Sequence, residues 1–159
     1  MELNKKKVEF LLNNMLKIVK RSEQARMPTR GTPGSAGLDL YACLDQPVTI
    51  APGDLVKIPT GISIGLPSSG YAAFLFARSG LAVKHGVNLS NGVGVIDSDY
   101  TGELIVGLCN VSSVPYTITP QERIAQLVVL PVSILEPVEV DSLEETQRGE
   151  GGFGSTGKF

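Results

Sequence analysis

The sequence has few cysteines and no long apolar run. Only two cysteines occur in 159 residues, Cys43 and Cys109, and each stands alone in an apolar stretch. This spacing excludes the paired cysteines of a zinc site and the density of a disulfide scaffold, so we interpret both as buried free thiols. No apolar stretch approaches the roughly 20 residues that span a membrane, so we expect no membrane partner and a cytoplasmic protein.

The sequence also lacks an excess of charge of one sign. Its 14 basic and 16 acidic residues give a formal net charge of −2. Without a broad positive field the chain is poorly suited to bind a nucleic acid, and none is expected as a partner. Neither the P-loop nor the dinucleotide-binding glycine pattern is present, so a polyanionic ligand would have to be met by other local groups.

Glycine and proline, by contrast, are frequent, with 18 and 10 residues. They divide the apolar sequence into short pieces rich in Val, Ile, Leu, Tyr and Phe, which is typical of many-stranded β proteins. Several pieces are apolar at consecutive positions, which suits a sheet covered on both faces. We therefore predict one all-β domain, a sandwich or barrel. Strands are expected at 16–20, 38–42, 47–51, 55–59, 62–66, 71–77, 104–110 and 124–132, and a helical turn at 79–86.

The first residues differ from the rest. Residues 1–14 mix lysines with a short apolar run, but Glu2 and Glu9 argue against a transit peptide. We interpret 1–14 as an N-terminal extension and 15–140 as the β domain.

The last residues are also different. Residues 141–159 are polar, charged and rich in glycine, so they bury too little apolar area to order themselves. Arg148 precedes the glycines, and Phe153 stands among them near Ser155 and Thr156. Such groups can hold phosphate and stack on a ring, so a phosphate clasp is the alternative to a disordered end.

The segment NGVGVIDSDYTGEL at 91–104 is the most informative part of the chain. It places glycines, three carboxylates and a tyrosine between apolar runs, as a hairpin that presents polar side chains would. From the residues alone, Asp97 and Asp99 either make local turn hydrogen bonds or take part in a reaction.

Five segments stand together in one order: AGLDLYA (36–42), ARSGLA (77–82), NGVGVIDSDYTGE (91–103), ERIAQLV (122–128) and RGEGGFGSTG (148–157). In these segments the chain resembles the trimeric dUTP diphosphatase (dUTPase) family. The resemblance implies a distorted jelly-roll β domain that forms a homotrimer, with active sites at the subunit interfaces. It implies that the arm at 141–159 closes a neighbouring site. It also implies hydrolysis of dUTP to dUMP and pyrophosphate, which limits uracil in DNA and supplies dUMP for dTMP synthesis.

The resemblance further implies roles for residues around the phosphate chain. Asp97 matches the carboxylate that activates the water attacking the α-phosphorus. Asp39 matches the aspartate that contacts the water shell of Mg²⁺, the implied cofactor. The positions that match phosphate-binding residues are Arg78, Ser79, Gly80, Gln126, Arg148, Gly152, Ser155 and Thr156.

Other matching positions imply how base and sugar are selected. Tyr100 matches the ring under the deoxyribose, and Phe153 the ring that stacks on the uracil. Cytosine would leave the buried groups that bind the uracil edge without hydrogen-bond partners, and such mismatches can lower kcat/KM by factors of about 10⁴. The positions that match the uracil-binding segment are Asn91, Gly94, Val95 and Ile96.

Two residues depart from the family pattern. Ala77 stands where a proline commonly precedes the arginine, and Gln121 where a glycine commonly precedes the acidic residue of ERIAQL. Both flank functional positions, so they bear on local turn geometry rather than on the chemistry.

Two other functions remain open from the sequence. One is dCTP deamination by a structural relative of the family, and the other is a nucleotide-gated binding protein. The tyrosine in IDSDY and the complete glycine-rich arm favour hydrolysis. The presence of Asp97 argues against a purely binding role.

Overall fold

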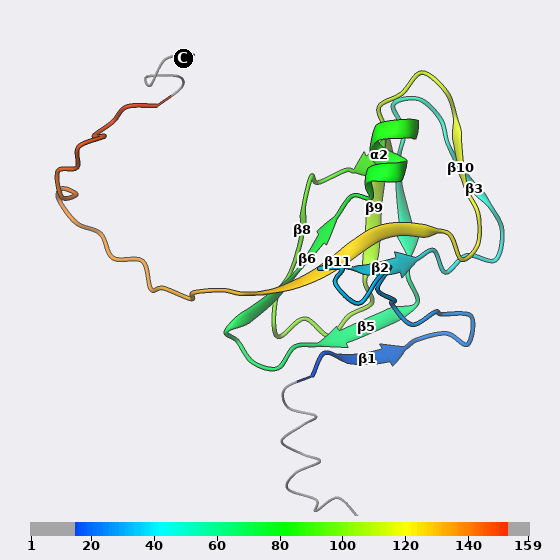
Figure 1. The fold of residues 1–159 in the computed structure, drawn as a ribbon, viewed down its shortest axis with the longest axis horizontal. Coiled ribbons are helices and arrows are strands. Elements are labelled where there is room, and N and C mark those ends of the chain that lie inside the picture. The colour runs from blue at the N-terminus through cyan, green and yellow to red at the C-terminus, as the bar shows by residue number, and fades with distance from the viewer. Residues whose placement is uncertain (1–14, 153–159) are drawn as a thin grey trace, which may run out of the picture.

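The computed structural model describes residues 15–152, which form eleven short strands and one helix (Figure 1). The prediction of an all-β domain is therefore confirmed. No helix in this part of the chain has the length and apolar character to cross a membrane. The strands are β1 (Lys17–Lys20), β2 (Leu38–Tyr41), β3 (Val48–Ile50), β4 (Leu55–Pro59), β5 (Ile62–Gly65), β6 (Tyr71–Phe76), β7 (Val87–Leu89), β8 (Gly94–Ile96), β9 (Ile105–Asn110), β10 (Tyr116–Ile118) and β11 (Arg123–Pro131), and the helix is α2 (Ser79–His85).

Each strand predicted from the sequence is present, with ends that differ by no more than one residue. The helical turn predicted at 79–86 is α2, which ends at Gly86 with a left-handed φ of 68°. A side chain on Gly86 would collide with Ser112, so this turn requires glycine. The strands β7, β8 and β10, each of three residues, were not predicted from the sequence.

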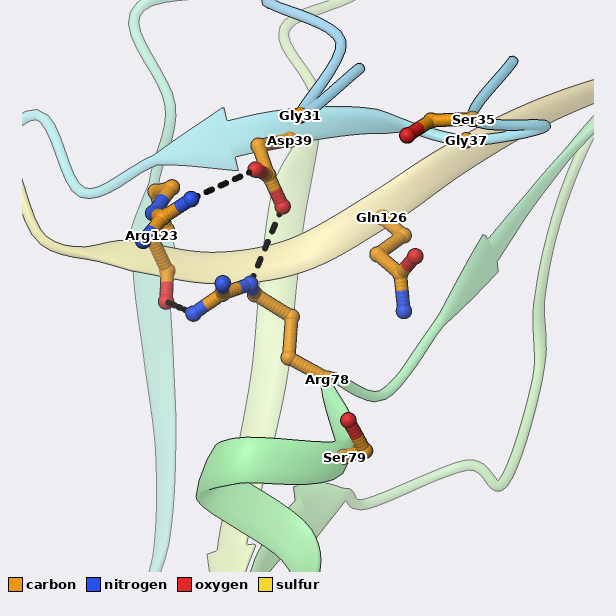
Figure 2. A pocket seen from close by; sticks show the side chains of 8 residues that line it. All are labelled: Gly31, Ser35, Gly37, Asp39, Arg78, Ser79, Arg123 and Gln126. Atoms are coloured by element: carbon orange, nitrogen blue, oxygen red, sulfur yellow. Dashed lines mark hydrogen bonds and ion pairs between the residues drawn. The ribbon is translucent and has the colours of Figure 1, made fainter.

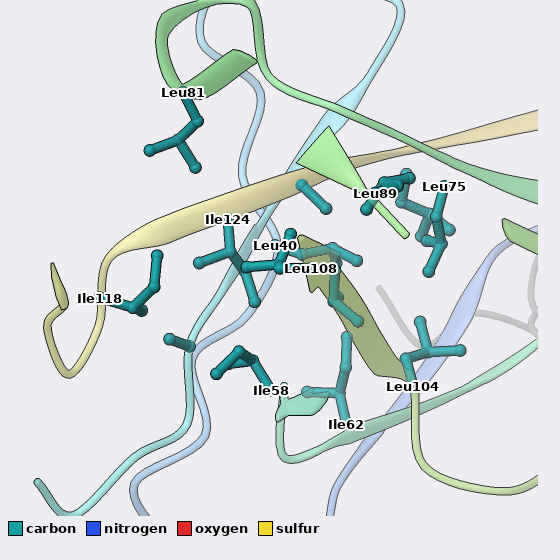
Figure 3. Packing of buried hydrophobic residues seen from close by; sticks show 14 of the residues in the cluster. Leu40, Ile58, Ile62, Leu75, Leu81, Leu89, Leu104, Leu108, Ile118 and Ile124 are labelled. Atoms are coloured by element: carbon teal, nitrogen blue, oxygen red, sulfur yellow. The ribbon is translucent and has the colours of Figure 1, made fainter. Parts of the chain in front are cut away.

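The strands form a four-stranded sheet, β2-β11-β6-β8, and a three-stranded sheet, β4-β9-β7, with the two further pairs β1-β5 and β10-β3. All of these pairings are antiparallel. The core is mainly aliphatic (Figure 3), and burying one such side chain contributes roughly 1.5–3 kcal/mol. Its largest buried side chains include Leu40, Ile50, Ile58, Ile62, Leu104, Leu108, Ile118, Ile124 and Leu127.

Residues 91–104 form the long connection between β7 and β9, which pair with each other. Inside this connection β8 pairs with β6 instead of with either neighbour in the chain. The expected polar hairpin is thus a crossing from one sheet to the other, followed by a turn at 97–103. Gly94 permits the crossing, because a Cβ there would lie only 3.0 Å from the Cβ of Leu75.

After β11 the chain continues as an extended segment, drawn in orange to red in Figure 1. Residues 132–152 contain no helix or strand. Large apolar side chains in this segment are exposed, including Leu135 at 84% and Val138 at 81%. The predicted extension at 1–14 and the last residues of the predicted arm, 153–159, lie outside the described residues.

Candidate active site

A polar pocket of about 210 Å³ lies where β2, β11 and the beginning of α2 meet (Figure 2). Antiparallel pairing creates this meeting point, because Gln126 of β11 lies opposite Asp39 of β2 on one side and Phe76 of β6 on the other. Four lining residues were predicted: Asp39, Arg78, Ser79 and Gln126. The pocket is lined in full by Gly31, Ser35, Gly37, Asp39, Arg78, Ser79, Arg123 and Gln126.

Asp39 is the buried charge of this pocket, with 8% of its surface exposed. One carboxylate oxygen accepts from Nε of Arg78 at 3.0 Å, and the other from Nη1 of Arg123 at 3.1 Å. Arg78 also donates through Nη1 to the carbonyl of Arg123 at 3.2 Å. A buried carboxylate needs such partners because losing its hydration is costly. Since two arginines face one carboxylate, the pocket keeps one excess positive charge, which suits an anionic ligand.

The predicted positions next to Arg78 lie at the start of α2. Arg78 is the extended residue before the helix, Ser79 lines the pocket, and Gly80 is exposed in the first turn without lining the pocket. Leu81 anchors this turn, since it is buried in the core.

Gln126 is held tightly beside this turn. Its Nε2 donates to the carbonyl of Ala77 at 3.1 Å. A Cβ on Gly37 would lie 3.1 Å from Oε1 of Gln126, so the glycine leaves room for this side chain. The alanine at position 77 still offers its carbonyl, and the departure from the family proline does not remove this contact.

Gln121, the second departure, keeps the backbone conformation that favours glycine. Its φ is 65°, and it is the one non-glycine residue with a positive φ between residues 15 and 152. This conformation costs a side-chain-bearing residue roughly 1 kcal/mol. Nε2 of Gln121 donates to the carbonyl of Gln24 at 2.8 Å, which offsets part of that cost.

The turn before Arg123 is fixed by a carboxylate. Glu122 accepts from the hydroxyl of Tyr116 at 2.7 Å and from the backbone N–H of Thr119 at 2.9 Å. Burial, reinforced by the hydrogen bond to Glu122, raises the pKa of Tyr116 to about 12. Tyr116 therefore stays a neutral donor at physiological pH, and its ring also contacts that of His85, with centroids 4.7 Å apart.

Asp97 and Tyr100 lie at a second pocket, of about 200 Å³. Both belong to the turn at 97–103, where the backbone N–H of Tyr100 donates to the carbonyl of Asp97 at 3.2 Å. The hydroxyl of Tyr100 donates to the carbonyl of Glu103 at 2.9 Å. Four of the lining residues were predicted, and the pocket is lined in full by Val95, Ile96, Asp97, Tyr100, Glu103, Leu104 and Ile105.

Two other predicted residues do not line this pocket. Asn91 is exposed in the turn before β8, where its carbonyl accepts from the N–H of Val93 at 2.8 Å. Gly94 is buried in β8 against Leu75.

The two pockets share no residue and lie at opposite ends of β6. Ile96 is opposite Ala73, so Asp97 is level with Ala72, and Arg78 follows six residues later in the chain. At about 3.3 Å per residue, this places Asp97 roughly 20 Å from Arg78. A single chain therefore does not bring the two residues to one reacting phosphorus atom.

The predicted arm residues approach neither pocket within the described part of the chain. Nε of Arg148 donates to the carbonyl of Gly151 at 2.8 Å, which closes a local turn, and Gly152 follows it. Phe153, Ser155 and Thr156 lie outside the described residues.

Arg123 was not predicted from the sequence, although this residue belongs to the ERIAQLV segment. Three further lining residues were not predicted: Gly31, Ser35, which directly precedes the AGLDLYA segment, and Gly37, which is the second residue of that segment. For Arg123, Gly37 and Ser35, their position in or next to a matched segment was the signal that could have identified them.

Comparisons with known proteins agree on one family. A family model described as dUTPase matches residues 23–157. The deoxyuridine 5'-triphosphate nucleotidohydrolase of Desulfitobacterium hafniense is 56% identical over 139 residues, which are 87% of this chain and 92% of that protein. The protein of the same name from Polynucleobacter necessarius is 51% identical over 143 residues, which are 90% of this chain and 96% of that protein.

Solved structures show the same relationship. The dUTPase of Staphylococcus bacteriophage 80alpha with dUPNHPP is 29% identical with a TM-score of 0.81, and the match covers 91% of this chain and 99% of that chain. A mutant dUTPase from phage phi11 of S. aureus, described with a structural Mg(II) ion, is 25% identical with a TM-score of 0.75 over 83% of this chain and 100% of that chain. The fold is the jelly-roll-type β fold of these proteins, as predicted.

Proposed function

Because this chain belongs to the dUTPase family, we propose that it hydrolyses dUTP to dUMP and pyrophosphate in sites shared between neighbouring subunits. One observation supports an active site that is shared between subunits. A cationic pocket around Arg78 and a carboxylate-bearing turn at Asp97 are each well formed, yet they lie about 20 Å apart in one chain. A homotrimer would join the cationic pocket of one subunit to the turn of the next.

In the proposed reaction Asp97 takes a proton from a water whose oxygen bonds to the α-phosphorus. The bond from that phosphorus to the bridging oxygen breaks, and pyrophosphate leaves. Asp97 is exposed and therefore accessible to a ligand. A general base supplies about 10²–10⁴ in rate, so stabilisation of the phosphate charge by groups such as Arg78 and Ser79 must supply much of the rest.

Asp39 would face a Mg²⁺ ion through its water shell. Among residues 15–152 no cluster of three or more His, Cys, Asp or Glu could chelate a metal, and each oxygen of Asp39 already accepts from an arginine. Each oxygen keeps a lone pair for a water molecule, so the site fits contact through water better than direct ligation. When bound, Mg²⁺ supplies positive charge that offsets the charge of the triphosphate.

The segment around β8 would select the base and the sugar. We assign the uracil edge to Asn91, Gly94, Val95 and Ile96, and the deoxyribose to the ring of Tyr100. The bond from the Tyr100 hydroxyl to the carbonyl of Glu103 fixes this ring in place, which supports a role in shape selection.

Exposed apolar surface supports the assembly into a trimer. A groove along β4 and β9 is lined by Leu55, Val56 and Ile105, and Leu55 is 71% exposed. The segment after β11 exposes Leu135 and Val138 as well. Apolar patches of this kind mark contact surfaces between proteins.

Pyrophosphate release from dUTP, dTTP, dCTP and UTP, each with and without Mg²⁺, tests the proposed function. We expect dUTP to be cleaved at least about 10²-fold faster than the other nucleotides, because a mismatched base or sugar leaves buried groups unpaired. We expect chelation of Mg²⁺ to lower the rate. Ammonia release from dCTP without cleavage of dUTP would instead identify a deaminase.

The arm is expected to act at the phosphates of a neighbouring site. Deleting residues 148–159 removes Arg148, Ser155, Thr156 and the ring of Phe153 from the proposed clasp. Since charge-assisted hydrogen bonds contribute about 1.5–3 kcal/mol, kcat/KM for dUTP should fall by about 10- to 100-fold. Size-exclusion chromatography should show the same assembly as the parent. Unchanged kcat/KM would contradict a role for the arm.

A further inference from the structure

The guanidinium group of Arg21 connects the N-terminal part of the domain to the turn at 97–103. Its Nε donates to Oγ of Ser63 at 2.8 Å, and its Nη2 donates to the carbonyl of Thr101 at 2.7 Å. Ser63 in turn donates to the carbonyl of Gly102 at 2.8 Å. Ser63 is only 3% exposed, so one arginine and one buried hydroxyl hold two consecutive carbonyls of the turn.

The other anchors of this turn lie at its ends. Before it, β8 is paired with β6. After it, Glu103 accepts from the N–H of Gly61 at 2.7 Å, and Leu104 donates to the carbonyl of Ile62 at 2.8 Å. Between these ends, the hydrogen bonds that reach the turn from elsewhere in residues 15–152 come from Arg21 and Ser63.

The carbonyls that Arg21 and Ser63 hold are next to Tyr100. A Cβ on Gly102 would collide with the ring of Tyr100, so the position of Gly102 sets the position of this ring. The N–H of Tyr100 donates to the carbonyl of Asp97 at 3.2 Å. A shift at 101 and 102 would therefore reach both Tyr100 and Asp97.

The pairing of β1 with β5 positions Arg21 beside the turn at 97–103. Val19 of β1 lies opposite Ser63 of β5, and the N–H of Arg21 donates to the carbonyl of Gly61 at 2.7 Å. An arginine suits the role because its planar fork donates in two fixed directions, whereas a lysine has a single flexible nitrogen. Arg21 lies before the segment matched by the family model, 23–157.

We propose that Arg21, acting through Ser63 and the carbonyl of Thr101, is a positioning residue for the turn that carries Asp97 and Tyr100. This inference rests on the proposed hydrolysis of dUTP. Arg21 sets how firmly the enzyme prefers a deoxyribose, because it fixes the ring that packs against the sugar.

Three variants test this role: Arg21→Met, Arg21→Lys and Ser63→Ala. Lys20→Met is the matched control, because this neighbouring exposed cation donates to the carbonyl of Glu23 and not to the turn. For each variant, kcat and KM are measured with dUTP and with UTP, and the thermal unfolding midpoint is recorded.

We expect Arg21→Met to lower kcat/KM for dUTP by about tenfold, which corresponds to the loss of one to two hydrogen bonds from a charged donor. UTP should be affected less, so the ratio of kcat/KM for dUTP to that for UTP should narrow. Arg21→Lys should give an intermediate ratio, Ser63→Ala a narrowed ratio, and Lys20→Met the ratio of the parent.

A ratio for Arg21→Met within about twofold of the parent value would overturn the inference, whatever the change in unfolding midpoint. If Arg21→Met does not fold, Arg21→Lys and Ser63→Ala test the proposal instead. A narrowed ratio of kcat/KM for dUTP to that for UTP in both variants supports the positioning role of Arg21, and a parent-like ratio in either variant rejects it. A parent protein that does not cleave dUTP would contradict the proposed function itself, which is a different result.

Discussion

Replacing Asp97 with asparagine is expected to lower kcat for dUTP by about 10²–10⁴, with a much smaller change in KM. Asparagine has nearly the same shape as aspartate but cannot take a proton from water. Within residues 15–152, Asp97 accepts a hydrogen bond through its backbone carbonyl and none through its carboxylate. The substitution therefore leaves the structure of the turn in place. Initial rates of pyrophosphate release over a range of dUTP concentrations measure both constants.

Asp99→Asn is the control for this substitution. Asp99 is also exposed and stands two residues later in the same turn. It does not line the pocket that contains Asp97, so kcat should stay close to that of the parent. If Asp97→Asn retained kcat within a few-fold, Asp97 would not be the base, and a large loss in Asp99→Asn would transfer that role to its neighbour.

The strands could be predicted because local chemistry delimits them. Proline and glycine stand at the ends of most apolar pieces, and each piece of four or more residues became a strand. The partners of β8 could not be predicted in the same way. Its pairing with β6 depends on non-local packing, including the close approach of Gly94 to Leu75. The separation of Asp97 from Arg78 follows from that pairing, so it could not be predicted from the sequence either.

Arg123 was missed for a related reason. Strict alternation along β11 would place Arg123 on the same face as Ala125 and Leu127, both of which are buried. The register instead shifts between Arg123 and Ala125, and a bulge of this kind re-aims the side chain before it. Arg123 consequently lines the pocket beside Gln126 and binds Asp39. A sequence pattern does not reveal such a shift.

Mixing two inactive variants should restore activity if the active site is shared between subunits. Arg78→Met removes the cationic group of one pocket, while Asp39 keeps its bond to Arg123. Asp97→Asn removes the base of the other pocket. In trimers formed at random from equal amounts, a site needs an intact Asp97 from one chain and an intact Arg78 from another. Each condition is met half of the time, so about a quarter of the parent activity should return after the two variants are unfolded and refolded together.

Arg78→Met mixed with Gln126→Ala provides the matched control for this experiment. Both residues line the same pocket, so they come from one chain. Every such pocket in a mixed trimer then carries one of the two defects, and the activity should stay at the average of the two variants measured alone. Recovery in the first mixture without recovery in the second would place Asp97 and Arg78 on different subunits of one site. If the activity of the first mixture also stayed at the average of its two variants, the proposal of a site shared between subunits would be wrong. Assembly would then not bring together Asp97 and Arg78, which lie roughly 20 Å apart in one chain.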